Sequence, residues 1–155
     1  MLTHERAGWL GEFEIVIKHR DGTIERQQLR NRLTDAALDM LRDALAGDLS
    51  DAQIKYLALG DDGTALDDTD TTLGNENFRV AFQSPVIGTT GKVEHITIVL
   101  DTEAVFHIRE IGVFAGAAAT SAPDSGILVS RVLWDRDKTN LESIQFVRTD
   151  TIGRA

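Results

Sequence analysis

Several residue types that often support a small fold are absent or scarce in this chain. The 155 residues include no cysteine and only two prolines. The lack of cysteine excludes a disulfide framework, a thiolate metal site and a thiol nucleophile. A chain of this length fits one domain with a sizeable core, so folding requires no disulfide or structural metal.

Long apolar runs and an excess of positive charge are also missing. The apolar runs extend over only a few residues, which predicts a soluble protein with no membrane-spanning helix and no secretory signal peptide. The chain carries 25 acidic and 16 basic residues, for a formal charge of −9. Because this charge repels phosphate, we expect no direct nucleic-acid partner and no membrane partner.

Most segments are short, rich in β-branched and aromatic residues, and bounded by glycine or polar turn residues. In the segment 12–18, Phe13, Ile15 and Ile17 fall on one side of a strand. Asp21-Gly22 predicts a tight hairpin, and the polar return segment 23–29 predicts an edge strand or one that crosses to another subunit. Further strands are predicted at about 54–59, 76–84, 92–100, 105–114, 127–134 and 141–148.

One segment has helical periodicity instead. Its stripe consists of Ala37, Leu38, Leu41, Ala44 and Leu45. Thr34 and Gly47 are suitable caps, so we predict one α-helix near residues 34–46 that packs on a sheet through this stripe, with a partner-binding helix as the alternative. The chain is therefore predicted to be mainly β (α+β), a β-sandwich or barrel-like domain over 12–148, with an N-terminal arm (1–11) and a C-terminal tail (149–155).

The segment 105–114 combines charged and strongly apolar residues. Phe106 and Ile108 occupy one side of the strand and Ile111 and Val113 the other, so either a bulge near Glu110 or burial on both faces is expected. Buried charges require partners. Structural ion pairs are therefore predicted, with a binding site as the alternative, for Arg79, Arg109, Glu110 and Arg131.

The densest charge feature is a run of five aspartates, Asp61, Asp62, Asp67, Asp68 and Asp70. Several oxygens in one loop suit a hard cation such as Ca²⁺, so these residues are a weak metal candidate. The alternative is a solvated loop with Asx turns and caps. The four histidines lack metal-binding spacing, and we expect no cofactor and no catalytic residue.

The aromatic residues near the N-terminus are candidates for a subunit interface, where aromatic side chains are enriched. The interface candidates are Trp9, Leu10 and Phe13. Trp134 is open to two interpretations, an anchor at a subunit interface or packing in the core or under a lid. Assembly is predicted to use the N-terminal arm and the edge strands, giving a homo-oligomer.

A chain of motifs supplies a family resemblance. The motifs are Ala44-Leu45-Ala46-Gly47, residues 54–60 (IKYLALG), residues 70–76 (DTTLGNE) followed by Phe78-Arg79, residues 108–114 (IREIGVF), and residues 125–132 (SGILVSRV). Over roughly residues 30–148 the sequence resembles small bacteriophage structural proteins of the tail-fibre or tail-collar-like type. This resemblance implies a non-enzymatic virion component, present in many copies or as a ring, without a cofactor.

The resemblance also sets the expected location and partners. The protein would assemble in the host cytoplasm with other virion proteins of the tail, baseplate or capsid. A capsid decoration (cement) protein is the alternative within the virion. A more distant alternative is a carbohydrate-active hydrolase or binding module with an acidic site at Asp61–Asp70.

Overall fold

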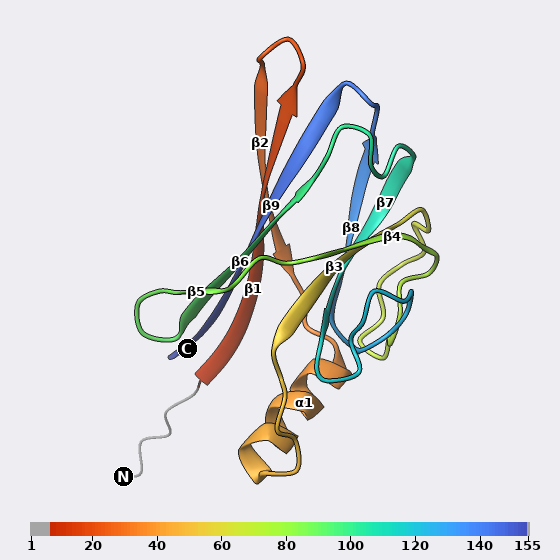
Figure 1. Cartoon of the computed structure of the whole chain (residues 1–155). Coiled ribbons are helices and arrows are strands. Elements are labelled where there is room, and N and C mark those ends of the chain that lie inside the picture. The colour runs from red at the N-terminus through yellow and green to blue at the C-terminus, as the bar shows by residue number, and fades with distance from the viewer. Residues whose placement is uncertain (1–6, 155) are drawn as a thin grey trace.

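The chain forms two antiparallel sheets packed face to face, with a single helix among the residues described, 7–154, in the computed structural model (Figure 1). The elements are β1 (Ala7–His19), β2 (Ile24–Asn31), α1 (Asp35–Ala46), β3 (Ile54–Gly60), β4 (Glu76–Ala81), β5 (Val86–Ile87), β6 (Lys92–Val99), β7 (His107–Ala115), β8 (Ile127–Asp137) and β9 (Glu142–Arg154). The predicted mainly β, sandwich-like fold is confirmed. No helix in the described range is long and apolar enough to cross a bilayer.

The strand orders are β2-β1-β9-β6-β5 in one sheet and β4-β3-β7-β8 in the other. Phe13, Ile15 and Ile17 are fully buried between the sheets, as their alternation predicts. Phe146 of β9 meets the ring of Phe13 edge-on at 6.1 Å and that of Trp134 at 5.9 Å. Trp134 therefore belongs to the core.

The predicted hairpin at Asp21-Gly22 is confirmed, and β2 lies at the edge of its sheet. Gly22 adopts a φ of 93°, a conformation that favours glycine. The Asp21 Oδ1 accepts the Thr23 N–H at 2.9 Å, which closes an Asx turn.

The predicted boundaries between the domain and its N-terminal arm and C-terminal tail are wrong within the described range. Residues 7–11 belong to β1 and residues 149–154 to β9, because these two strands pair continuously from Ala7↔Arg154 to His19↔Glu142. The pairing was hidden in the sequence because this part of β9 contains several polar residues. The remainder of the predicted arm and tail, 1–6 and 155, lies outside the described residues.

The helix begins and ends as predicted, but its buried face differs from the predicted stripe. The Thr34 hydroxyl oxygen accepts the Ala37 N–H, and Gly47 is left-handed with φ 79°. Ala37 and Met40 are buried, whereas Leu38 is 51% and Leu45 82% exposed. The helix lies at one end of the sandwich (Figure 1) and docks there through its Ala37–Met40 side.

Strand β7 is buried on both faces and also contains an irregularity. Its register with β8 shifts between Ile108 and Glu110, and Arg109 is exposed there. Beyond the shift, Ile111 and Val113 join the core between the sheets, while Phe114 packs with Leu73 in a second cluster. Both predicted explanations for this segment are therefore confirmed.

Candidate functional site

An apolar groove opens at the end of the sandwich where α1 and β5 lie. It encloses about 330 Å³. Elements that are distant in the sequence supply its apolar lining, including Trp9 of β1, Leu41 of α1, Ile54 of β3, Ile87 of β5 and Ile152 of β9. We call it the end groove.

Exposed leucines on α1 extend the groove into a larger apolar surface. Leu38, Leu41 and Leu45 follow i, i+3, i+7 spacing and therefore form one stripe on the helix. Leu41 lines the groove, so the stripe is continuous with it. Ile87, on the opposite rim, is 85% exposed. We call the end groove together with Leu38, Leu45 and Val86 the end surface.

A buried ion pair lies behind the end groove. Arg148 is fully buried and donates from Nη2 to Asp150 Oδ1 at 2.9 Å and from Nη1 to Ser130 Oγ at 2.7 Å. Trp9 Nε1 donates to the same Asp150 oxygen at 2.8 Å. Because these contacts join β1, β8 and β9, they fix the position of the Trp9 ring at the groove.

His95 also lines the groove, and the protonation state of its imidazole affects how polar the groove is. Its side chain is buried, its ring lies 5.6 Å from that of Phe82, and its Nδ1 has no hydrogen-bond partner. Burial lowers the pKa of His95, although the nearby Asp150 carboxylate opposes this shift. A neutral imidazole keeps the groove suited to apolar groups.

The three predicted interface residues lie in different surroundings: at the end groove, on the surface and in the core. Trp9 lies at the end groove, and Leu10, on the opposite face of β1, is partly exposed. The prediction for Phe13 is wrong, because the side chain is 1% exposed and packs between the sheets. Phe13 shares the inward face of β1 with Trp9, deeper in the sandwich.

The structure places the predicted ion-pair residues in two separate groups. Arg131 Nε pairs with Glu110 Oε1 at 2.8 Å, and both side chains are buried. Arg79 pairs instead with Glu76 at 2.8 Å and lies 4.1 Å above the Phe114 ring. The prediction for Arg109 is wrong: it is exposed at the irregularity of β7 and has no ion pair within 4.0 Å among residues 7–154.

Glu110 also has partners that the sequence did not reveal. Its carboxylate accepts the backbone N–H of Asp62 at 3.0 Å, of Gly74 at 2.7 Å and of Asn75 at 2.9 Å. The loop 61–75 is thereby held on the outer face of the sheet. Residue type predicted a charged partner for Glu110 but not these backbone donors.

The five aspartates do not form the candidate calcium site. Among residues 7–154, no three of their carboxylates bring oxygens within 4.8 Å of one another. Each carboxylate has a local partner instead: Asp61 accepts from Asn75, Asp62 from Thr64, Asp67 from Thr69, Asp68 from Arg32 and Asp70 from Arg131. These are the Asx turns and ion pairs of the alternative prediction, and they give no support to a carbohydrate-active site.

Hydrogen bonds within the turns also affect the titration of this loop. Bonds from the Thr64 hydroxyl and backbone lower the pKa of Asp62, and bonds from the Thr69 backbone and hydroxyl lower that of Asp67. Both carboxylates are therefore ionised at neutral pH, as acceptors within their own turns.

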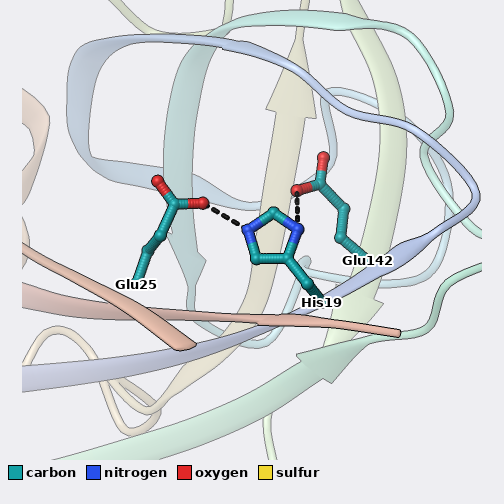
Figure 2. Close-up of side chains that lie close together, drawn as sticks. All are labelled: His19, Glu25 and Glu142. Atoms are coloured by element: carbon teal, nitrogen blue, oxygen red, sulfur yellow. Dashed lines mark hydrogen bonds and ion pairs between the residues drawn. The ribbon is translucent and has the colours of Figure 1, made fainter. Parts of the chain in front are cut away.

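A charged cluster at the opposite end of the sandwich was not predicted. His19 lies between two carboxylates (Figure 2). Its Nε2 is 2.5 Å from Glu25 Oε2, and its Nδ1 is 3.9 Å from Glu142 Oε2. Arg136 Nη2 donates to Glu25 at 3.0 Å and also to Glu142. The hairpin at Asp21-Gly22 implies that His19 and Glu25 are neighbours, but Arg136 and Glu142 come from β8 and β9.

This cluster has the ligand types of a metal site, but a cation of the protein already occupies it. The ligand atoms of His19, Glu25 and Glu142 lie within 4.8 Å of one another. The carboxylates face opposite nitrogens of the ring, however (Figure 2). The Arg136 guanidinium bonds to both carboxylates. The arrangement is therefore a closed ionic network that ties the β1–β2 hairpin to β8 and β9.

Comparison with known proteins found no match for this chain among family models, curated proteins or solved structures. The resemblance to phage structural proteins therefore stays a prediction that depends on the motifs alone. The two most exposed large aliphatic side chains among the described residues, Leu45 and Ile87, both lie at the end surface.

Proposed function

We propose that this chain is a non-enzymatic structural subunit of a bacteriophage virion, associated with the tail, tail fibre or baseplate, which contacts its neighbours through the end surface. The observation that carries the proposal is the exposure of large aliphatic side chains around one groove, above all Leu45 and Ile87. Contiguous apolar surface on a folded domain marks an interaction site, because covering it removes that surface from water.

The surface is held rigidly, which favours docking over rearrangement. Thr34 caps α1 and donates its hydroxyl to the Leu128 carbonyl, so the helix is fixed to β8. On the other side of the groove, Trp9 is bonded to Asp150. Association then requires little ordering of the groups that make contact, which lowers its entropic cost.

The motifs behind the phage resemblance also have a scaffolding role. Glu110 of the segment 108–114 binds Arg131 of the segment 125–132 and the backbone of Gly74 and Asn75. Arg79 donates to the Ser125 carbonyl at 2.8 Å. The residues that define the resemblance thus bond to one another and hold loops on a sheet, as a structural subunit requires.

The proposal changes the expected assembly route. Residues 7–11 are committed to β1, so in the described part of the chain the end surface replaces the arm as the main contact. The edge strand β5 belongs to this surface, whereas the edge strand β2 is polar. A capsid decoration protein could use the same surface. The position of this chain in the particle, on the tail or on the capsid, therefore separates the two alternatives.

The test uses particles of the phage that encodes the chain. An epitope tag inserted at the β1–β2 turn, away from the end surface, allows immunogold labelling, with mass spectrometry of the purified particles as a second readout. We expect label on the tail or its fibres. Label over the capsid would favour decoration, and absence of the protein from the particles would overturn the proposal.

A pair of variants tests the surface itself. Leu45→Glu places a charge on the end surface. Leu141→Glu is the matched control, because Leu141 is 51% exposed but lies beside the β1–β2 hairpin, where its carbonyl accepts the Arg20 N–H. We expect particles to incorporate Leu141→Glu and to exclude Leu45→Glu. Equal incorporation of both would show that the end surface is not the contact.

A further inference from the structure

We propose that the end surface is covered by the same surface of a second copy, in a closed two-fold dimer with antiparallel α1 helices. The choice of surface rests on the proposed function, and the inference adds the identity of its occupant. An interface in which each copy contributes the same patch closes after two subunits and leaves no exposed apolar remainder.

The first argument for a second copy is that the projecting aliphatic side chains and the groove lie on the same patch of the surface. Leu45 and Ile87 are the two most exposed large aliphatic side chains among the described residues. The end groove opens between the elements that carry them, α1 and β5. A two-fold axis through this patch therefore lets the projecting side chains of each copy enter the groove of the other.

The second argument is the stripe on α1. Two antiparallel helices related by a two-fold axis near Leu41 place Leu38 of one copy opposite Leu45 of the other. The i, i+3, i+7 spacing gives each helix a continuous apolar ridge for such packing. Over its twelve residues, α1 is about 18 Å long, enough to present the whole ridge.

The third argument is the charge beside the stripe. Arg42 donates to Asp39 Oδ1 at 3.1 Å and from Nε to Asp43 Oδ1 at 2.9 Å. Because this flank contains both signs, two copies of it can meet with arginine facing aspartate. Such rim pairs fix the relative orientation more than they add affinity.

The arrangement of apolar and charged side chains also suits a dimer interface. The side chains of the end surface that are about half or more exposed are Leu38, Leu45, Val86, Ile87 and Ile152. A stable interface buries about 800 Å² on each partner, with an apolar centre and a polar rim. The leucine stripe and Ile87 supply the centre, and the charged residues of α1 supply the rim.

The absence of cysteine allows a sharp test of this geometry. The single variants Leu38→Cys and Leu45→Cys are purified, and oxidative crosslinking is compared between each alone and their mixture. Antiparallel helices predict more crosslinked dimer in the mixture than in either variant alone. Leu141→Cys at the opposite end is the control and should give no dimer. Equal yields from all samples would overturn the proposed helix arrangement.

Sedimentation velocity tests the stoichiometry. We expect the wild type to be a dimer at about 100 µM, well above a micromolar Kd, and Leu45→Glu to raise the dimer Kd by about 30-fold or more. Leu141→Glu should leave it unchanged, and circular dichroism checks that both variants are folded. A wild-type monomer, a larger assembly, or a dimer unaffected by Leu45→Glu would overturn the inference.

The two proposals fail in distinguishable ways. If the chain is monomeric but Leu45→Glu is still excluded from particles, a different virion protein covers the end surface and the dimer is wrong. If the dimer forms as described but the chain is absent from particles, the dimer stands and the virion function is wrong.

Discussion

Arg131 Nε lies 2.8 Å from Glu110 Oε1, with both side chains buried where the loop 61–75 crosses β7 and β8. The same carboxylate accepts three backbone N–H groups from that loop. Arg131 in turn donates from Nη2 to the Asp62 carbonyl at 3.1 Å. One buried pair thus satisfies donors and acceptors from two strands and a loop.

Replacing Glu110 by glutamine should destabilise the protein strongly. The amide is similar in size, but it leaves the buried Arg131 guanidinium without its closest counter-charge. Breaking a buried pair in this way costs about 3–5 kcal/mol. Urea unfolding followed by circular dichroism should show this loss as a lower midpoint.

The matched control is Glu14→Gln. Glu14 pairs with Arg26 at 3.2 Å on the surface, where the two side chains are 43% and 65% exposed. An exposed pair contributes about 0–1 kcal/mol, so this variant should unfold close to the wild type. A similar loss in both variants would mean that the Glu110–Arg131 pair has no special structural role.

Gly11→Ala should also destabilise the fold, although the change adds only a methyl group. A Cβ at Gly11 would overlap the Arg148 guanidinium, which is buried and held by Asp150 and Ser130. Overpacking of this kind costs about 1–3 kcal/mol. Gly8→Ala, on the same strand, is the control, because nothing lies within 4 Å of a Cβ there. Equal thermal midpoints for the two variants would contradict this account of Gly11.

The strands and helix ends were predictable because their signals are local. Alternation placed Phe13 on the inner face of β1, and Thr34 and Gly47 identified the helix caps. The rotation of α1 was not predictable, since apolar side chains extend around much of the helix. Burial of Ala37 and Met40, rather than of the larger Leu38 and Leu45, depends on the space available at the end of the sandwich.

The end groove could not be predicted because it is built from distant segments. Trp9 was identified as an interface candidate, but its neighbours Leu41, Ile87 and Ile152 belong to three other elements. Arg148 and Asp150 gave no signal of burial either, because their pairing depends on the β1–β9 register. Polar residues in a strand normally indicate an exposed face, and here two of them pair inside the fold.

His95 should make stability fall as the pH drops from neutral. Burial lowers the pKa of His95 in the folded state, whereas the unfolded side chain titrates near pH ~6.5. Below that pH the unfolded chain binds a proton that the folded chain does not, so unfolding becomes more favourable. The free energy of unfolding of the wild type should therefore decrease from about pH 7.5 to about pH 5.5.

The variant His95→Gln isolates this contribution. Its unfolding free energy should depend less on pH over the same range, because it lacks the group that takes up the proton. His107→Gln is the control, since the His107 side chain is 41% exposed and its loss leaves His95 in place. If His95→Gln and the wild type lose stability in parallel, His95 does not contribute to the pH dependence.

The His19 cluster should bind a divalent metal only after Arg136 is removed. Although burial raises the pKa of Glu142, hydrogen bonds from Arg136 and Thr139 hold it below its ordinary value, so the carboxylate is charged and already has a counter-ion. Neither Zn²⁺ nor EDTA should then change the thermal midpoint of the wild type.

In Arg136→Gln, Glu25 and Glu142 face His19 without that guanidinium, and Zn²⁺ should raise the midpoint by mass action. Arg136→Gln/His19→Ala, which lacks the imidazole ligand, should lose this response. A rise in the wild-type midpoint with Zn²⁺ that Glu142→Gln abolishes would show that the metal displaces Arg136.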